Sequence, residues 1–145
     1  MLRLLVVEDF PPLAKALLRA LRQAGFQVQM AASRAEARHV EGWFDAAIVD
    51  LELPDGSGID VVGQLNTATQ VGKVIFFTAC ADQDLLAEAA ALGRVVDKAA
   101  GVAMLLQCLN QRLAEGDELR VAVGDVLGAS VSVSPSQRSG TRRMR

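Results

Sequence analysis

Short apolar runs alternate with longer amphipathic segments along the first 115 residues of the chain. Most of these runs place apolar residues at successive positions, which is typical of a strand buried on both faces. The amphipathic segments repeat apolar residues every three or four positions, as helices with one buried face do. Strands are predicted at about 2–7, 27–31, 45–50, 73–77 and 94–97. This alternation predicts an α/β fold with a mostly parallel sheet.

Local signals place the helices between these strands. Pro11 and Pro12 suit the first turn of a helix, and Gly25 is a stop signal. The segment Ser33–Glu36 is a capping box, and Asp82 is a plausible N-cap for a helix over about 83–92. The third and fifth helices are expected from near Ser57 and over about 101–114.

The handedness of the crossovers leaves few topologies for such a chain. We expect a doubly wound, five-stranded parallel sheet of order 2-1-3-4-5, which is the flavodoxin-like arrangement. This order places the first and third strands side by side. The residues that follow these two strands therefore meet at the switch point of the sheet.

The character of the sequence changes after about Glu115. The segment Val121–Val133 is apolar but interrupted by glycine, and the last residues are rich in serine and arginine without any acid. We expect one domain over 1–115 and a weakly structured tail over 116–145. A hairpin from 119 to 133 is an alternative for part of this tail.

Composition excludes several classes of protein. The formal net charge of −2 indicates neither a nucleic-acid binder nor a membrane-surface protein, and we do not expect this chain alone to bind nucleic acid. No apolar run approaches the roughly 20 residues of a membrane span, and no signal peptide is visible. The two cysteines lack metal-ligand spacing, which favours a reducing compartment. We therefore expect a cytoplasmic protein without membrane contacts.

Reactive side chains follow four of the five predicted strands. Glu8 and Asp9 follow the first strand, Asp50 ends the third, and Thr78 and Lys98 follow the last two. Three carboxylates at one edge of a sheet repel one another, and a hard divalent cation such as Mg²⁺ relieves that repulsion. Asp50 can then act as a nucleophile toward a phosphoryl donor. Lys98 would pair with the transferred phosphate, and Thr78 would donate a hydrogen bond to it.

These residues and their surroundings resemble the receiver domain of bacterial two-component response regulators. The resemblance covers about residues 2–114 and is most specific at Asp50–Gly58, with the sequence DLELPDGSG. It further rests on Glu8-Asp9, Thr78-Ala79 and Lys98.

The resemblance implies a role for each of these positions. Asp50 would be the phosphoacceptor of a phosphorelay, and a histidine kinase or phosphotransfer protein would donate the phosphoryl group. Glu8, Asp9, Asp50 and the backbone carbonyl of Glu52 would hold Mg²⁺. Thr78 and Lys98 would sense the phosphate. By the same resemblance, Glu52 and Cys80 flank the path of a hydrolytic water.

The sequence departs from the family pattern near the last strand. Ala99 stands where many members have a cis proline, and a cis bond before alanine would cost about 3 kcal/mol. Val95 stands where an aromatic switch residue is usual. We still expect output through the fourth helix, last strand and fifth helix, toward a downstream partner or a second copy. Met104 and Cys108 are expected to form an apolar strip on the outer side of the fifth helix.

Two other functions are compatible with the sequence. One is a magnesium-dependent phosphohydrolase with Asp50 as nucleophile, although that class has its nucleophile on the first strand. The other is the receiver fragment of a DNA-binding transcription regulator. The signalling switch is the preferred interpretation, and it predicts no enzymatic activity beyond self-phosphorylation and self-dephosphorylation.

Overall fold

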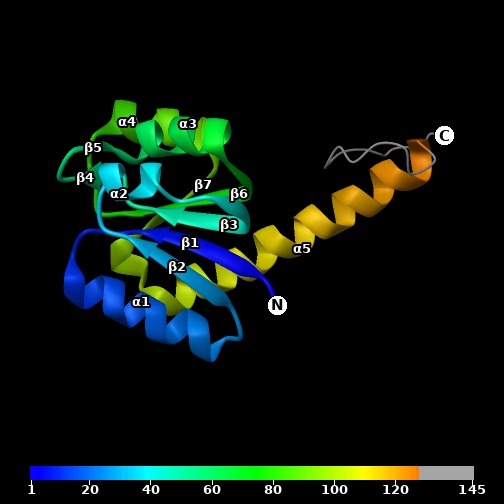
Figure 1. The fold of residues 1–145 in the computed structure, drawn as a ribbon, viewed down its shortest axis with the longest axis horizontal. Coiled ribbons are helices and arrows are strands. Elements are labelled where there is room, and N and C mark those ends of the chain that lie inside the picture. The colour runs from blue at the N-terminus through cyan, green and yellow to red at the C-terminus, as the bar shows by residue number, and fades with distance from the viewer. Residues whose placement is uncertain (128–145) are drawn as a thin grey trace. The chain divides into compact units, whose positions relative to one another are not determined.

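Five parallel strands form the central sheet of the computed structural model, which describes residues 1–127 (Figure 1). The strand order is β2-β1-β3-β6-β7, so the predicted order of the five main strands is confirmed. These strands are β1 (Arg3–Val7), β2 (Gln27–Ala31), β3 (Gly42–Val49), β6 (Thr69–Thr78) and β7 (Arg94–Asp97). Every neighbouring pair is parallel, which places all the carboxyl ends of the strands at one edge.

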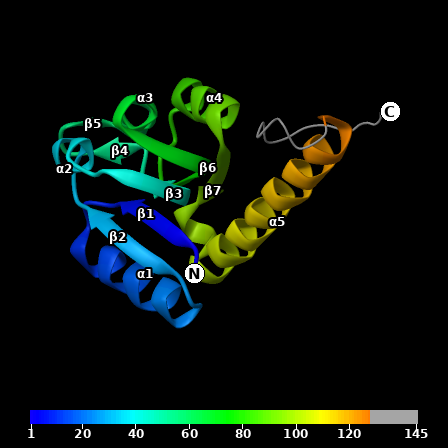
Figure 2. The ribbon, with the colours of Figure 1, turned by 45° about the vertical axis from the view of Figure 1, so that its right-hand side comes forward.

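Helices cover both faces of this sheet. Figures 1 and 2 show α1 on one face and α2, α3 and α4 on the other. The helices are α1 (Pro11–Gln23), α2 (Arg34–Arg38), α3 (Gly58–Ala68), α4 (Gln83–Leu92), the 3-10 turn η1 (Lys98–Ala100) and α5 (Val102–Leu127). The α4 bounds agree with the sequence prediction, and Asp82 caps α4 by accepting hydrogen bonds from two main-chain N–H groups.

A small hairpin interrupts the expected alternation of strand and helix. β4 (Glu52–Leu53) and β5 (Gly56–Ser57) pair antiparallel directly after Asp50. The sequence analysis predicts no strand between Asp50 and the third helix, because strands of two residues leave no hydrophobic period to detect. The hairpin occupies the space between the end of β3 and the start of α3.

The central strands are buried on both faces, as their unbroken apolar runs predict. All residues of Leu4–Val7 are at most 1% exposed, and Phe44, Phe76 and Phe77 fill the space between strands and helices. α1 contributes Leu17 and Leu21 from its apolar face. Burial of each such side chain stabilises the fold by about 1.5–3 kcal/mol.

The fifth helix is longer than the sequence analysis predicts. It continues to Leu127, so residues 116–127 are helical and not a weakly structured tail, and no hairpin begins at residue 119. Gly124 suggests an interruption of the segment after Val121, but a glycine costs a helix only about 1 kcal/mol relative to alanine. The rest of the expected tail, 128–145, lies outside the described residues. The division into 1–115 and 116–145 stays a prediction.

By their contacts, the residues fall into two units, Met1–Cys108 and Leu109–Arg145. The residues that the sequence analysis assigns to the site all belong to the first unit. Within the described residues, no helix has the length and apolarity that a membrane span needs. The same residues contain no cis peptide bond, so Lys98 joins Ala99 through a trans bond.

Gly58 offers a direct test of the packing behind the hairpin. A Cβ at this position would collide with the carbonyl oxygen of Asp50 and lie 2.9 Å from Cγ1 of Val49. We expect Gly58→Ala to lower the free energy of unfolding by about 2–3 kcal/mol, as measured by urea denaturation.

Gly63 is the matched control on the same helix. A Cβ there meets no heavy atom within 4 Å. Gly63→Ala should raise the free energy of unfolding by about 0.5–1 kcal/mol, because alanine loses less backbone entropy on folding. Equal effects of the two substitutions would contradict the close approach at Gly58.

Candidate functional site

Four strands deliver chemically active side chains to the same edge of the sheet. Glu8 and Asp9 follow β1, Asp50 follows β3, Thr78 is the last residue of β6, and Lys98 follows β7. Glu8, Asp50 and Thr78 are the buried polar residues of the described chain, with exposures of 3%, 5% and 2%. Burial of polar groups is costly unless they are paired, so their contacts determine what the site can do.

Lys98 bridges the two buried carboxylates. Its Nζ lies 2.8 Å from Oδ2 of Asp50 and 3.1 Å from Oε1 of Glu8. The three residues are far apart in sequence, and the parallel sheet alone brings them together. The sequence analysis expects Lys98 to pair with a phosphate on Asp50, and that role stays a prediction; in the structure the Lys98 ammonium contacts the Asp50 carboxylate itself.

Main-chain N–H groups hold both carboxylates in place. Oδ1 of Asp50 accepts a hydrogen bond from the N–H of Glu52 at 3.2 Å. Oε2 of Glu8 accepts one from the N–H of Phe10 at 3.1 Å. The N–H of Asp50 itself donates to the carbonyl of Val7 at 3.0 Å, which ties the end of β3 to the end of β1.

The carboxylates of Glu8, Asp9 and Asp50 form one cluster. Each offers an oxygen that lies within 4.8 Å of the oxygens of the other two. Asp9 is exposed, whereas its two neighbours are buried. Hard oxygen ligands at this spacing suit Mg²⁺, which binds few carboxylates and keeps several waters.

The environment shifts the pKa values of two groups in this cluster. Burial raises the pKa of Glu8 above its usual range, and the charge of Asp50 adds to this effect against hydrogen bonds from Phe10 and Lys98. Burial alone would lower the pKa of Lys98, but its hydrogen bonds to Asp50 and Glu8 raise that pKa overall. The metal-free site therefore contains a firmly protonated lysine and a carboxyl group that ionises reluctantly.

Thr78 and Glu52 lie at the rim of the same site. The hydroxyl of Thr78 accepts a hydrogen bond from the N–H of Cys80 at 3.2 Å, which fixes the start of the loop to α4. The side chain of Glu52 is exposed. Its main-chain N–H contacts Asp50, whereas its role as a carbonyl ligand stays a prediction.

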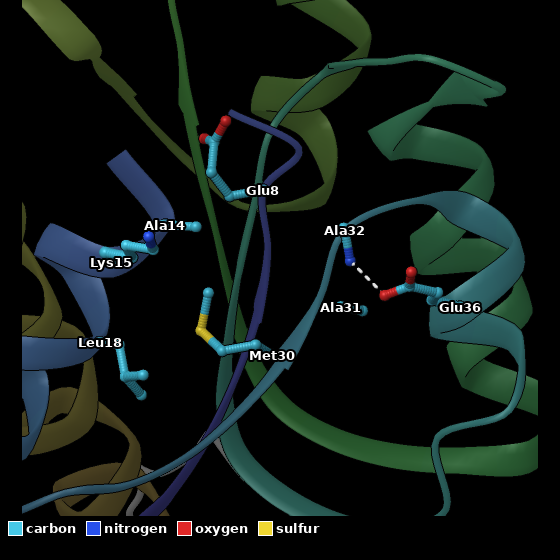
Figure 3. A pocket seen from close by; sticks show the side chains of 8 residues that line it. All are labelled: Glu8, Ala14, Lys15, Leu18, Met30, Ala31, Ala32 and Glu36. Carbon is cyan, nitrogen blue, oxygen red and sulfur yellow. Dashed lines mark hydrogen bonds between the residues drawn. The ribbon is translucent and has the colours of Figure 1, made fainter. Parts of the chain in front are cut away.

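A pocket of about 190 Å³ lies beside Glu8, between α1 and β2 (Figure 3). Figure 3 shows Met30 and Leu18 in its apolar part and the carboxylate of Glu8 at one end. The lining residues are Glu8, Ala14, Lys15, Leu18, Met30, Ala31, Ala32 and Glu36. Small-molecule sites usually enclose about 300–1,000 Å³, so this pocket is too small for most ligands. The residues able to carry out chemistry lie at the carboxyl ends of the strands instead.

The expected apolar strip on α5 is wrong. Met104 is 47% exposed, but Cys108 is only 5% exposed and lies 3.6 Å from the guanidinium of Arg94. The two residues are one turn apart, and the helix is rotated so that Cys108 faces inward. Met104 alone is the exposed apolar residue of this pair.

Sequence analysis also missed two residues that hold the loop after Asp50. Asp55 accepts hydrogen bonds from the first residues of α2, and Arg34 reaches across to α3. Asp55 is visible only as a turn residue and Arg34 only as the second residue of a capping box. The sequence carries no signal that pairs them.

The strand order and the acidic cluster at its switch point define a flavodoxin-like α/β protein. Residues 4–110 match the response regulator receiver domain family, and the chain belongs to this family. Receiver domains of response regulators act as signalling switches and not as conventional enzymes.

Curated relatives and a solved structure agree with this assignment. The transcriptional regulatory protein DpiA of Escherichia coli strain K12 is 38% identical over 96 residues, which cover 63% of this chain and 42% of DpiA. The swarming motility regulation protein RssB of Serratia marcescens is 41% identical over 81 residues, which cover 54% of this chain and 36% of RssB. The match thus spans about two fifths of the length of these relatives.

One structurally similar protein was solved with a bound metal ion. The response regulator protein TrrA of Thermotoga maritima, solved in complex with Mg²⁺-BeF, superimposes with a TM-score of 0.66 at 26% identity. The match covers 77% of this chain and 99% of that chain.

The raised pKa of Glu8 predicts a pH-dependent stability in the metal-free protein. Because the folded state favours the protonated carboxyl, this stabilisation is fully present below the ordinary value of 4.5 and is lost as the pH rises through the higher folded value. The glutamine of Glu8→Gln does not ionise, so this variant does not lose stability at position 8 as the pH rises. We expect its stability relative to the wild type to increase between about pH 4 and pH 7.5.

Urea denaturation at both pH values, with a metal chelator in the buffer, measures this difference in stability between Glu8→Gln and the wild type. Glu88→Gln, which replaces an exposed glutamate of α4, is the control and should follow the wild type. A Glu8→Gln difference that stays constant with pH would show that burial does not perturb Glu8.

Proposed function

We propose that the chain accepts a phosphoryl group on Asp50 and thereby acts as the switch of a two-component phosphorelay. The observation that carries this proposal is the contact of the Asp50 carboxylate with Lys98, beside two further carboxylates, at the switch point of the sheet. A carboxylate held by one cation and one N–H group is oriented for attack.

The proposed step is a direct transfer. An oxygen of Asp50 attacks the phosphorus of a phosphohistidine on the donor protein, and an acyl phosphate forms as the P–N bond breaks. The electron pair of that bond returns to the imidazole. The new phosphate carries about −1.5 to −2 charge, which Lys98 is placed to balance.

The acidic cluster fits a magnesium ion. Lys98 contacts two of the three clustered carboxylates, and TrrA, a relative by fold and sequence, was solved with Mg²⁺-BeF. Glu8, Asp9, Asp50 and the carbonyl of Glu52 would hold the ion in this chain. A bound Mg²⁺ would neutralise negative charge on the transferring phosphoryl group.

Thr78 and Lys98 would detect the phosphate. The Thr78 hydroxyl accepts a hydrogen bond from Cys80 and would donate its own proton to a phosphoryl oxygen. Both residues lie at the ends of β6 and β7, the strands that flank α4. We therefore propose output through α4, β7 and the first turns of α5, toward a downstream partner or a second copy.

The donor would be a histidine kinase or a phosphotransfer protein in the cytoplasm. Matched relatives such as DpiA are transcriptional regulatory proteins more than twice as long as the matched segment. A DNA-binding output is therefore proposed only for a longer regulator that contains this chain.

Phosphorylation tests the proposal directly. With Mg²⁺ and acetyl phosphate, intact-mass spectrometry should show one added phosphoryl group, and Asp50→Asn should abolish it because an amide is not a nucleophile here. Asp84→Asn, which changes an exposed aspartate of α4, should retain the label. Steady release of phosphate from small phosphoesters would favour a phosphohydrolase, and equal labelling of Asp50→Asn would place the acceptor elsewhere.

Two substitutions separate side-chain from main-chain ligands. Asp9→Ala should weaken Mg²⁺ binding about tenfold or more because it removes a carboxylate. Glu52→Ala should change it by less than about threefold, since any residue supplies a carbonyl. Isothermal calorimetry without a phosphodonor measures both. The reverse order would show that the proposed ligand set is wrong.

A further inference from the structure

The hairpin β4–β5 is tied to α2 by a polar cluster outside the site itself. At the hairpin tip, the two carboxylate oxygens of Asp55 accept hydrogen bonds from the N–H groups of Arg34 and Ala35, at 2.8 and 2.9 Å. These are the first two residues of α2. The bonds, the one from Arg34 foremost, hold the pKa of Asp55 below its usual range, so the carboxylate is charged at neutral pH.

Arg34 extends this connection to α3. Its Nε donates to the side-chain oxygen of Gln64 at 2.9 Å, and the Gln64 amide donates back to the Arg34 carbonyl at 3.4 Å. The Arg34 guanidinium also lies 3.5 Å from the carbonyl oxygen of Asp55 and 3.8 Å from the Asp60 carboxylate. One arginine thus contacts the hairpin and α3 from the start of α2.

The arginine side chain also lies directly on the hairpin backbone. A Cβ added to Gly56 would lie 2.8 Å from Cδ and 2.9 Å from a terminal nitrogen of Arg34. Residue 56 therefore has no room for a side chain while Arg34 occupies this place. The contact packs the backbone at Gly56 against the Arg34 side chain of α2.

The other end of the hairpin reaches the phosphoacceptor. Glu52, the first residue of β4, donates its N–H to Oδ1 of Asp50 at 3.2 Å. The N–H of Gly58 closes the loop by donating to the carbonyl of Leu51 at 3.0 Å. A shift of the hairpin would therefore move the Glu52 main chain relative to Asp50.

We propose that Asp55 and Arg34 are positioning residues that hold the β4–β5 hairpin and, through it, fix the main chain of Glu52 beside Asp50. This inference rests on the proposed function, since it assigns these residues to the same site. They touch no reacting atom. Their effect is to keep the Glu52 N–H on the Asp50 carboxylate and the Glu52 carbonyl at a constant place for the metal.

A simpler role for Asp55 is to cap a short helix. Ser33 provides the control, because its hydroxyl caps the same helix by accepting a hydrogen bond from the N–H of Glu36 at 3.1 Å. Ser33 makes this contact within α2, whereas Asp55 joins α2 to the hairpin. Removal of the Ser33 hydroxyl costs α2 one N–H acceptor and removal of the Asp55 carboxylate costs it two, but only the loss of Asp55 releases the hairpin.

The test is Mg²⁺ affinity, measured by calorimetry on the full chain without a phosphodonor, with urea stability measured in parallel. Asp55→Ala should weaken Mg²⁺ binding about tenfold, which is typical for loss of a group that orients metal ligands. Ser33→Ala should lower stability similarly and leave Mg²⁺ affinity within about twofold of the wild type. Asp55→Asn retains one acceptor oxygen and should recover part of the loss.

Arg34→Lys is a second variant for the same test. It keeps the positive charge and the main-chain bond to Asp55 but removes the planar fork that reaches Gln64. Mg²⁺ affinity should fall by about threefold, less than for Asp55→Ala. At saturating Mg²⁺, the labelling rates of both variants with acetyl phosphate should return to within about twofold of the wild type.

Unchanged Mg²⁺ affinity in Asp55→Ala, or an equal loss in Ser33→Ala, would overturn the inference. A wild type that binds no Mg²⁺ would overturn it together with the proposed metal site. A wild type that binds Mg²⁺ and shows the expected order of variants, but is not labelled on Asp50, would support the positioning role and refute the phosphoacceptor role alone.

Discussion

The contact between Lys98 and the two buried carboxylates is the constraint on which the site depends. A buried charge without a partner costs several kcal/mol, and removal of one member of a buried pair typically costs about 3–5 kcal/mol. Glu8, Asp50 and Lys98 come from the ends of three different strands, and none can find this partner locally. The register that joins β1, β3, β6 and β7 must therefore be correct before any of these charges is balanced.

The same contact leaves an imbalance that gives the site its character. One ammonium group contacts two of the three clustered carboxylates, and the environment already resists ionisation of Glu8. A fold selected for stability alone would replace one of the buried acids with an apolar residue. The excess negative charge instead favours a bound cation, so the feature that weakens the empty site is the one that equips it for phosphoryl chemistry.

The sequence predicts most of this arrangement because parallel topology determines it. Once five strands alternate with helices, the residues that follow them must meet at one edge, and Asp50 and Lys98 are recognisable before any coordinates. The Asp55–Arg34 connection is different. These residues lie 21 positions apart, and no period or capping rule links a hairpin tip to a neighbouring helix.

Helix faces and ends were harder to predict for related reasons. Spacing put Met104 and Cys108 on one face of α5, but which face turns inward depends on tertiary packing, and Cys108 is buried. The change in sequence character after Glu115 favours an end to α5 near residue 114, whereas the helix continues to Leu127 and tolerates the moderate cost of its glycines. The helix propensity of a single residue is a weak predictor of where a helix ends when the residues on both sides of it favour the helix.

The absence of an aromatic residue at Val95 determines how a switch in this chain can operate. Val95 is half-buried on β7 opposite Phe76. A valine side chain is short and restricted at χ1, so its rotation moves few atoms. The strand pairing offers another route, because Thr78 lies opposite Asp97 in the β6–β7 register. Asp97 in turn accepts a hydrogen bond from the N–H of Ala99 at 2.8 Å and so fixes the turn that carries Lys98.

Thr78 and Lys98 are therefore joined through the main chain of one strand pair. If a phosphate on Asp50 contacts both groups, as proposed, it would stabilise a state in which the ends of β6 and β7 shift together, because only a difference in contacts can move the equilibrium between two states. Since Thr78 begins the loop to α4 and Lys98 begins the turn before α5, such a shift would reach both helices without a side-chain rotation.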